Sequence, residues 1–189
     1  MRQSRDHSGM TYIESITFFA AITGYAGLTA NMVLVAANRH RRYHMIPVAL
    51  IVFAHVLLVW HFRYEWEIDR ATRNGYAGFV IFHTALLGIL SAPLVGSRLA
   101  RRLVAFSFFV AAMGASGAVL RYEEVAIYRL PVLVCDLAGL AALAYWIFRP
   151  CGPLGPANAY FRRYFGVNRH ERDPGRRVGA VNRQNDRGD

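Results

Sequence analysis

The sequence predicts an all-α fold, a bundle of about five transmembrane helices. Apolar residues make up 54% of the 189 residues and fall in long blocks rather than in amphipathic alternation. The charged residues collect in the gaps between these blocks. A charge at the centre of a bilayer costs at least about 2.5–3.5 kcal/mol, so this separation is typical of a chain that crosses a membrane.

Five apolar blocks are long enough to cross the hydrocarbon core, which takes about twenty residues of helix. Residues 1–149 are therefore predicted to form one helical bundle. Residues 150–189 are predicted to form a basic, partly disordered tail, with an interfacial segment at 157–165 where aromatic residues and paired arginines mix. The helices are expected at 12–37, 45–62, 76–95, 103–120 and 130–148.

The distribution of arginine predicts the orientation of the bundle. The first and third connections hold three arginines each and no acidic residue, and nine more arginines follow residue 148. The second and fourth connections hold three and two arginines, matched by three and two acidic residues. The positive-inside rule then places the N-terminus outside and the tail in the cytoplasm, as in a multi-pass protein of a bacterial inner membrane.

The formal charge of +10 is explained by the same anchoring, so we expect membrane lipid as a partner and no nucleic acid. No sequence typical of a nucleotide-binding loop, a serine hydrolase or a zinc protease is present, and an enzyme is the less favoured interpretation. The two cysteines, Cys135 and Cys151, lie too far apart along the chain to suggest a disulfide, and they form no zinc motif. The identity of any metal is open.

Two histidines lie well inside the apolar blocks. His55 and His83 are each about eight residues from the second connection, so both rings are expected about 12 Å below the same surface. They could ligate a b-type haem or a metal ion between neighbouring helices. In the alternative, each ring forms a hydrogen bond with a neighbouring carbonyl or hydroxyl group, with Thr84 and Ser107 as candidates. His44 lies on the same helical face as His55 and is a weaker candidate for a cofactor site, since it could simply extend the basic first connection.

A carboxylate inside the fifth block suggests a second polar site. Asp136 is expected near the outer surface, where Arg121 and Arg129 are plausible partners. With His61 at the end of the second helix and Glu14 at the start of the first, Asp136 and Arg121 could form one polar cluster. Such a cluster could admit protons or a quinone, or it could be a salt-bridged rim, which is the favoured interpretation.

Small residues recur in the fourth block, at Ala111, Gly114, Ala115, Gly117 and Ala118. Small residues at this spacing let helix backbones approach closely in lipid. We expect this face to pack against small residues of other helices. The candidates are Gly24 and Gly27 in the first helix and Gly78 and Gly88 in the third.

Three short patterns resemble those of a known family. His40-Arg41-Arg42 precedes the second helix, Phe79-Val80-Ile81-Phe82-His83 lies in the third, and the fourth is rich in glycine and serine. Over about residues 37–120 the chain resembles a small bacterial multi-helix membrane family linked to the assembly of haem-copper oxidases. The resemblance implies that His40 (or His44) and His83 are family histidines. The family's His-Arg before its fourth helix is replaced here by Ala100-Arg101-Arg102.

Together these features favour an accessory or assembly protein of a respiratory or photosynthetic electron-transfer complex, with other membrane subunits as partners. Short connections and the lack of a catalytic motif suit a protein that acts by helix packing. Two alternatives remain: a redox protein that binds b-type haem or a metal through His55 and His83, and a small ion- or proton-coupled carrier that uses Asp136.

Overall fold

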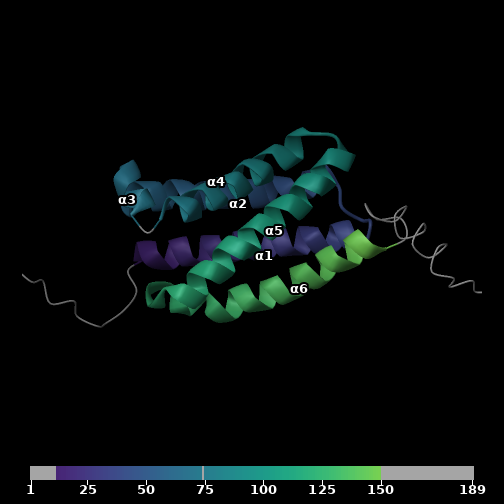
Figure 1. The fold of residues 1–189 in the computed structure, drawn as a ribbon. Coiled ribbons are helices and arrows are strands. Elements are labelled where there is room, and N and C mark those ends of the chain that lie inside the picture. Colours follow the sequence, from purple (N-terminus) through teal and green to yellow (C-terminus); the bar gives the residue numbers. More distant parts are fainter. Residues whose placement is uncertain (1–11, 74, 150–189) are drawn as a thin grey trace, which may run out of the picture.

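The computed structural model describes residues 12–73 and 75–149, which form helices with no strand in these ranges (Figure 1). Five helices are long and apolar enough to cross a membrane, which confirms the predicted fold class. They are α1 (Tyr12–Ala36), α2 (Met45–Phe62), α4 (Tyr76–Ser91), α5 (Ser97–Arg121) and α6 (Arg129–Phe148). The shorter elements are α3 (Ile68–Thr72) and three 3-10 helices, η1 (Arg42–His44), η2 (Ala92–Leu94) and η3 (Glu123–Tyr128).

The largest difference from the predicted boundaries is at the start of α5. This helix begins at Ser97 rather than near residue 103, so the three arginines expected in a turn belong to its first turns. Arginine is a good helix former, and its charged head can reach water from a helix end. A count of apolar residues therefore places the start of such a helix too late. The predicted tail and its segment at 157–165 lie outside the described residues.

The helix α1 occupies the centre of the bundle. It packs against α2, α5 and α6, while α4 packs against α5 and α2. Figure 1 shows α5 crossing α1 at an angle. The pair α2 and α4 lies on one side of this crossing, and the helix α6 lies on the other. All five spans are therefore linked through α1 and α5.

The two ends of the bundle differ in charge. The first, here called the arginine-rich end, is where α1, α4 and α6 finish and α2 and α5 begin. Its described residues include seven arginines and no acidic residue: Arg39, Arg41, Arg42, Arg98, Arg101, Arg102 and Arg149. At the opposite end, where α1 begins, arginines and acidic residues are mixed.

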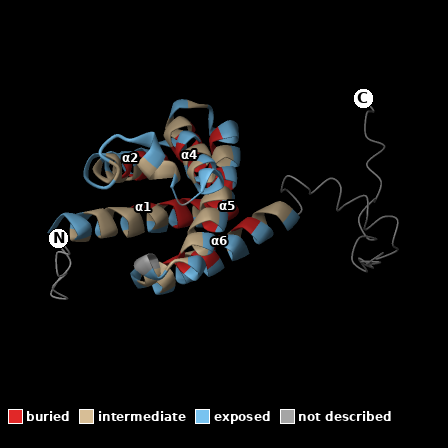
Figure 2. Cartoon of the chain, turned by 60° about the vertical axis from the view of Figure 1, so that its left-hand side comes forward, coloured by how far each residue is buried: buried red, intermediate tan, exposed pale blue. Residues whose placement is uncertain are grey.

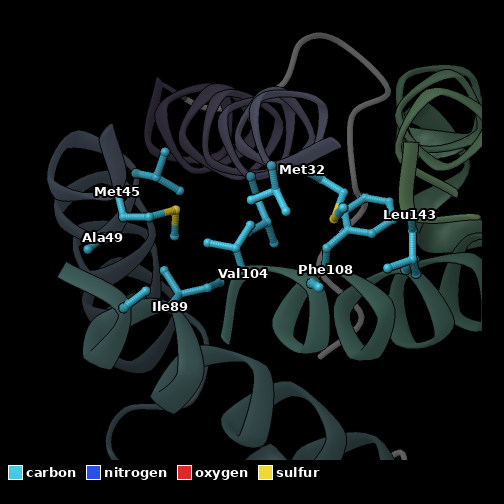
Figure 3. Close-up of a cluster of buried hydrophobic side chains, with 13 residues drawn as sticks. Met32, Met45, Ala49, Ile89, Val104, Phe108 and Leu143 are labelled. Atoms are coloured by element: carbon cyan, nitrogen blue, oxygen red, sulfur yellow. The ribbon is translucent and has the colours of Figure 1, made fainter. Parts of the chain in front are cut away.

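The hydrophobic core lies toward the arginine-rich end. Figure 2 shows buried residues where α1, α4, α5 and α6 come together, and Figure 3 shows the apolar side chains that fill this region. Phe108 of α5 and Met32 of α1 are fully buried there. The whole cluster consists of Leu28, Met32, Val35, Met45, Val48, Ala49, Ile89, Ala92, Val104, Ala105, Phe108, Ala112 and Leu143.

Glycines permit the closest helix contacts, although not all in the predicted pairs. A Cβ at Gly114 would lie 3.1 Å from Ile81, and one at Gly88 would overlap Ser107, so α4 and α5 do approach through small residues. Gly24 and Gly27 face Val52 and Val48 of α2 instead of the fourth span. The tightest position is Gly139 of α6, where any side chain would overlap the ring of Phe108.

Candidate functional site

Among the residues whose burial the structure describes, the most deeply buried carboxylate is Asp136, which is 5% exposed and lies in the second turn of α6. The hydroxyl of Tyr25 donates a hydrogen bond to its Oδ1 atom. The hydroxyl of Ser116 donates to its Oδ2 atom, at 2.5 Å. Both carboxylate oxygens are thus bound by hydroxyl groups from α1 and α5. Because a buried carboxylate with a donor on each oxygen favours one arrangement of its neighbours, Asp136 helps to fix how these three helices pack.

The neighbours of this site fix its geometry. The ring of Tyr25 stacks on Phe108, with centroids 6.2 Å apart and planes 9° apart. The side chain of Thr29, one turn further along α1, donates to the Tyr25 carbonyl at 3.0 Å and lies beside the Cys135 thiol. Because Gly139 leaves room for Phe108, α5 comes close enough to α6 for Ser116 to reach Asp136.

Arg121 and His61, two other members of the predicted polar cluster, have neighbours of their own. Arg121 lies over the ring of Tyr122, with its guanidinium carbon 5.6 Å from the centroid. His61 accepts a hydrogen bond of 3.4 Å from the Trp66 indole nitrogen. Glu14 lies in the first turn of α1. The partners of Asp136 are hydroxyl groups rather than the arginines that its charge suggested.

Arg129, the second arginine expected beside Asp136, instead closes the end of α5. Its Nε atom donates to the Val119 carbonyl at 2.8 Å, and its Nη2 atom donates to Glu123 at 2.8 Å. Arg129 therefore stabilises the connection between α5 and α6. This connection lies at the end of the bundle away from the arginine-rich end.

The two intramembrane histidines each bind a backbone carbonyl. The Nδ1 atom of His55 lies 3.1 Å from the Thr17 carbonyl of α1. The Nδ1 atom of His83 lies 2.8 Å from the Phe79 carbonyl of its own helix. A carbonyl can only accept, so Nδ1 is the donor in both hydrogen bonds, and in a neutral ring Nε2 would keep its lone pair.

The rings of His55 and His83 lie against different neighbours. His55 faces α1, whereas the ring of His83 packs on Phe79, at 4.0 Å between centroids, and near Trp60 of α2, at 6.1 Å. These contacts fit the alternative in which each ring binds a carbonyl, although the acceptors are not Thr84 and Ser107. Haem ligation stays a prediction. No group of three or more His, Cys, Asp or Glu that could hold a metal is found within residues 12–73 and 75–149.

His44 lies at the arginine-rich end, apart from His55. Its Nδ1 atom accepts the Arg41 backbone N–H at 3.3 Å, which closes the turn η1. Its ring is 6.0 Å from that of His40, between centroids, with the planes 85° apart. The described contacts thus assign His44 to the first connection rather than to a site with His55.

Sequence reasoning missed Tyr25 and Ser116. Both lie inside apolar blocks and carry no charge, so neither interrupts the hydropathy pattern. The only signal that could have found them is Asp136 itself, because a buried carboxylate needs donors from neighbouring helices.

Comparison of the chain with protein-family models, with curated proteins and with solved structures gave no match.

Proposed function

We propose that this chain is a multi-pass protein of a bacterial inner membrane that acts as an accessory or assembly subunit of a respiratory or photosynthetic electron-transfer complex. It would act by packing its helices beside other membrane subunits. The observation that carries the proposal is a pair of open glycines on the apolar helix surface that the bundle itself leaves uncovered. In the most apolar stretch of each span, only 17–33% of the residues are buried within the chain.

The outer face of α6 illustrates this surface. Leu130 and Leu137 are 74% and 73% exposed, and the residues between them on the same side are also exposed. In a membrane either lipid tails or another protein covers such a face. Leucine packs equally well against both, so this face alone does not select a protein partner.

Two open glycines favour a protein partner. Gly78 near the start of α4 and Gly117 near the end of α5 are exposed, and a Cβ at either would meet no atom within 4 Å. The helices α4 and α5 pack together, and both glycines lie toward the end of the bundle away from the arginine-rich end. Small residues on an open face let a second helix approach closely, which is the main attraction between helices in lipid.

A photo-crosslinking residue placed at position 117 tests the proposal in native membranes. The expected result is a covalent adduct with a membrane subunit of an electron-transfer complex, identified by mass spectrometry. Position 50, a leucine that is 64% exposed on α2, is the matched control for lipid-facing surface, because it lies on a helix that carries neither of the two glycines. Adducts with lipid alone at position 117, or equal protein adducts at both positions, would oppose the proposal.

Ligation of b-type haem by His55 and His83 is the second candidate. It is favoured by the protonated Nδ1 atoms, because histidines that bind a metal usually fix this tautomer with a backbone carbonyl and ligate through Nε2. A dithionite-reduced absorption spectrum of the purified protein tests it. A band of b-type haem that is lost in both His55→Ala and His83→Ala would favour the redox protein over the accessory subunit.

A further inference from the structure

A shallow depression lies at the arginine-rich end, between the first connection and the start of α5. Its volume is about 470 Å³, and it is lined by Asn38, Arg39, His40, Arg41, Ser97 and Arg101. The chain turns sharply into this region because Asn38 adopts the left-handed conformation, at φ 59°, that ends many helices. The Arg101 guanidinium then donates to the Asn38 side-chain oxygen at 2.7 Å, which ties the connection to α5.

One wall of the depression contains a buried side chain whose polar atoms have no partner. His40 is 6% exposed, and its two ring nitrogens are enclosed by the protein and form no hydrogen bond with another described residue. An imidazole always presents at least one N–H donor, and a buried donor without an acceptor costs about 1–3 kcal/mol. A ligand toward which the ring turns from the wall of the depression would supply the missing acceptor.

The charges around His40 select an anion. Arg39, Arg41 and Arg101 line the depression, and no acidic residue is present among the described residues of this end. Ser97 is the first residue of α5, a helix of 25 residues with no side-chain cap. The first N–H groups of such a helix lack intrahelical acceptors and attract negative charge.

The same charges disfavour a cation, although His40 and His44 lie close together. Burial, followed by His44 and then Arg101, lowers the pKa of His40 to about 4. The ring is consequently neutral at neutral pH while the depression is empty. An anion beside it would offset the effect of Arg101 and favour the protonated ring, with two donors instead of one.

We propose that this depression binds a phosphate group, held by the His40 ring, the Arg101 guanidinium and the first turn of α5. A phosphate provides several acceptor oxygens and a charge near −2, which suits three neighbouring arginines. The helix ends place the site at the depth of lipid headgroups, so the group could come from a phosphomonoester lipid or from free phosphate. Both sources present the same phosphate group to the site.

The test uses the full chain purified in detergent. Inorganic phosphate is titrated by calorimetry, and retention of phosphatidic acid is measured by native mass spectrometry against phosphatidylcholine. We expect saturable binding of at least one of the two. Binding of inorganic phosphate alone identifies free phosphate as the source, and binding of phosphatidic acid alone identifies lipid.

Three variants connect binding to the site. Arg101→Gln and His40→Leu are expected to weaken binding at least about tenfold, the effect of losing one charge-assisted hydrogen bond. Arg102→Gln changes an exposed arginine at the next position, outside the lining residues, and should keep the Kd within about twofold.

His40→Leu also separates binding from folding. Because leucine leaves no unpartnered nitrogen, the thermal midpoint of this variant should equal or exceed that of the wild type while its binding is lost. No saturable binding of either probe, or equal losses in Arg101→Gln and Arg102→Gln, would overturn the proposal.

Discussion

The hydroxyl group of Tyr25, near the middle of α1, donates a hydrogen bond to the carboxylate of Asp136 in α6, 111 positions later in the sequence. This contact joins the first and last spans of the described bundle. Ser116 of α5 binds the other oxygen of the same carboxylate, so three helices meet at one buried acidic group.

Tyr25→Phe should lower the free energy of unfolding by about 1–3 kcal/mol, because it leaves one buried carboxylate oxygen without its donor. The measurement is reversible unfolding in mixed micelles. Tyr145→Phe, on an exposed side chain of α6, is the matched control and should change little. Equal stability of the Tyr25→Phe variant and the wild type would show that the hydroxyl does not stabilise the bundle.

Gly139→Ala should destabilise the bundle by about 1–3 kcal/mol, because the added methyl group overlaps the Phe108 ring. Gly117→Ala is the control, since its Cβ meets open space. Replacing Phe108 with leucine in the Gly139→Ala background should recover part of the loss. If both alanine variants melted together with the wild type, the close approach of α5 to α6 would be contradicted.

Lowering the pH should destabilise the protein through His40. Burial, with His44 and Arg101, lowers the pKa of His40 from 6.5 to about 4 in the folded protein. The unfolded chain therefore binds more protons between these two values, and stability falls as the pH drops from about 6.5 to 4. Thermal midpoints measured over this range should fall less steeply in His40→Leu than in the wild type. Parallel curves would exclude a contribution from His40.

Cys135 reports on the carrier alternative. Its thiol lies beside Thr29 within the span, next to Asp136. If the chain works by helix packing, no water-filled path reaches this position. A membrane-impermeant thiol reagent should then leave Cys135 unlabelled in a Cys151→Ser background, while Asp69→Cys in the second connection should be labelled. Rapid labelling of Cys135 would instead favour an ion- or proton-coupled carrier.

The sequence predicted the spans well because the bilayer imposes a length and an apolar composition on every crossing helix. It could not predict the rotation of each helix, which decides what a side chain meets. The matched depth of His55 and His83 could therefore be predicted, but the carbonyl groups of Thr17 and Phe79 that their rings bind could not. The charge of Asp136 favoured arginines as partners, whereas its partners are uncharged hydroxyl groups, which leave no trace in a charge pattern.

The start of α5 shows a related limit. Its first arginines are excluded from an apolar count, although the helix continues through them to Ser97. The burial of His40 could not be predicted either, because a histidine between two arginines is typical of an exposed connection. In the structure the adjoining helix η1 packs against α5 and η2, and His40 is buried beside it.

The amount of assembled electron-transfer complex in membranes of a deletion strain tests the proposed role most directly. Reduced-minus-oxidised spectra of these membranes measure the haem-copper oxidase and its partner cytochromes. We expect the complex to fall in the deletion strain and to be restored by the wild-type gene and by Met113→Leu. The double variant Gly78→Leu and Gly117→Leu, which fills two positions where a Cβ meets no atom within 4 Å, should restore it poorly. Normal amounts of every electron-transfer complex in the deletion strain would contradict the account.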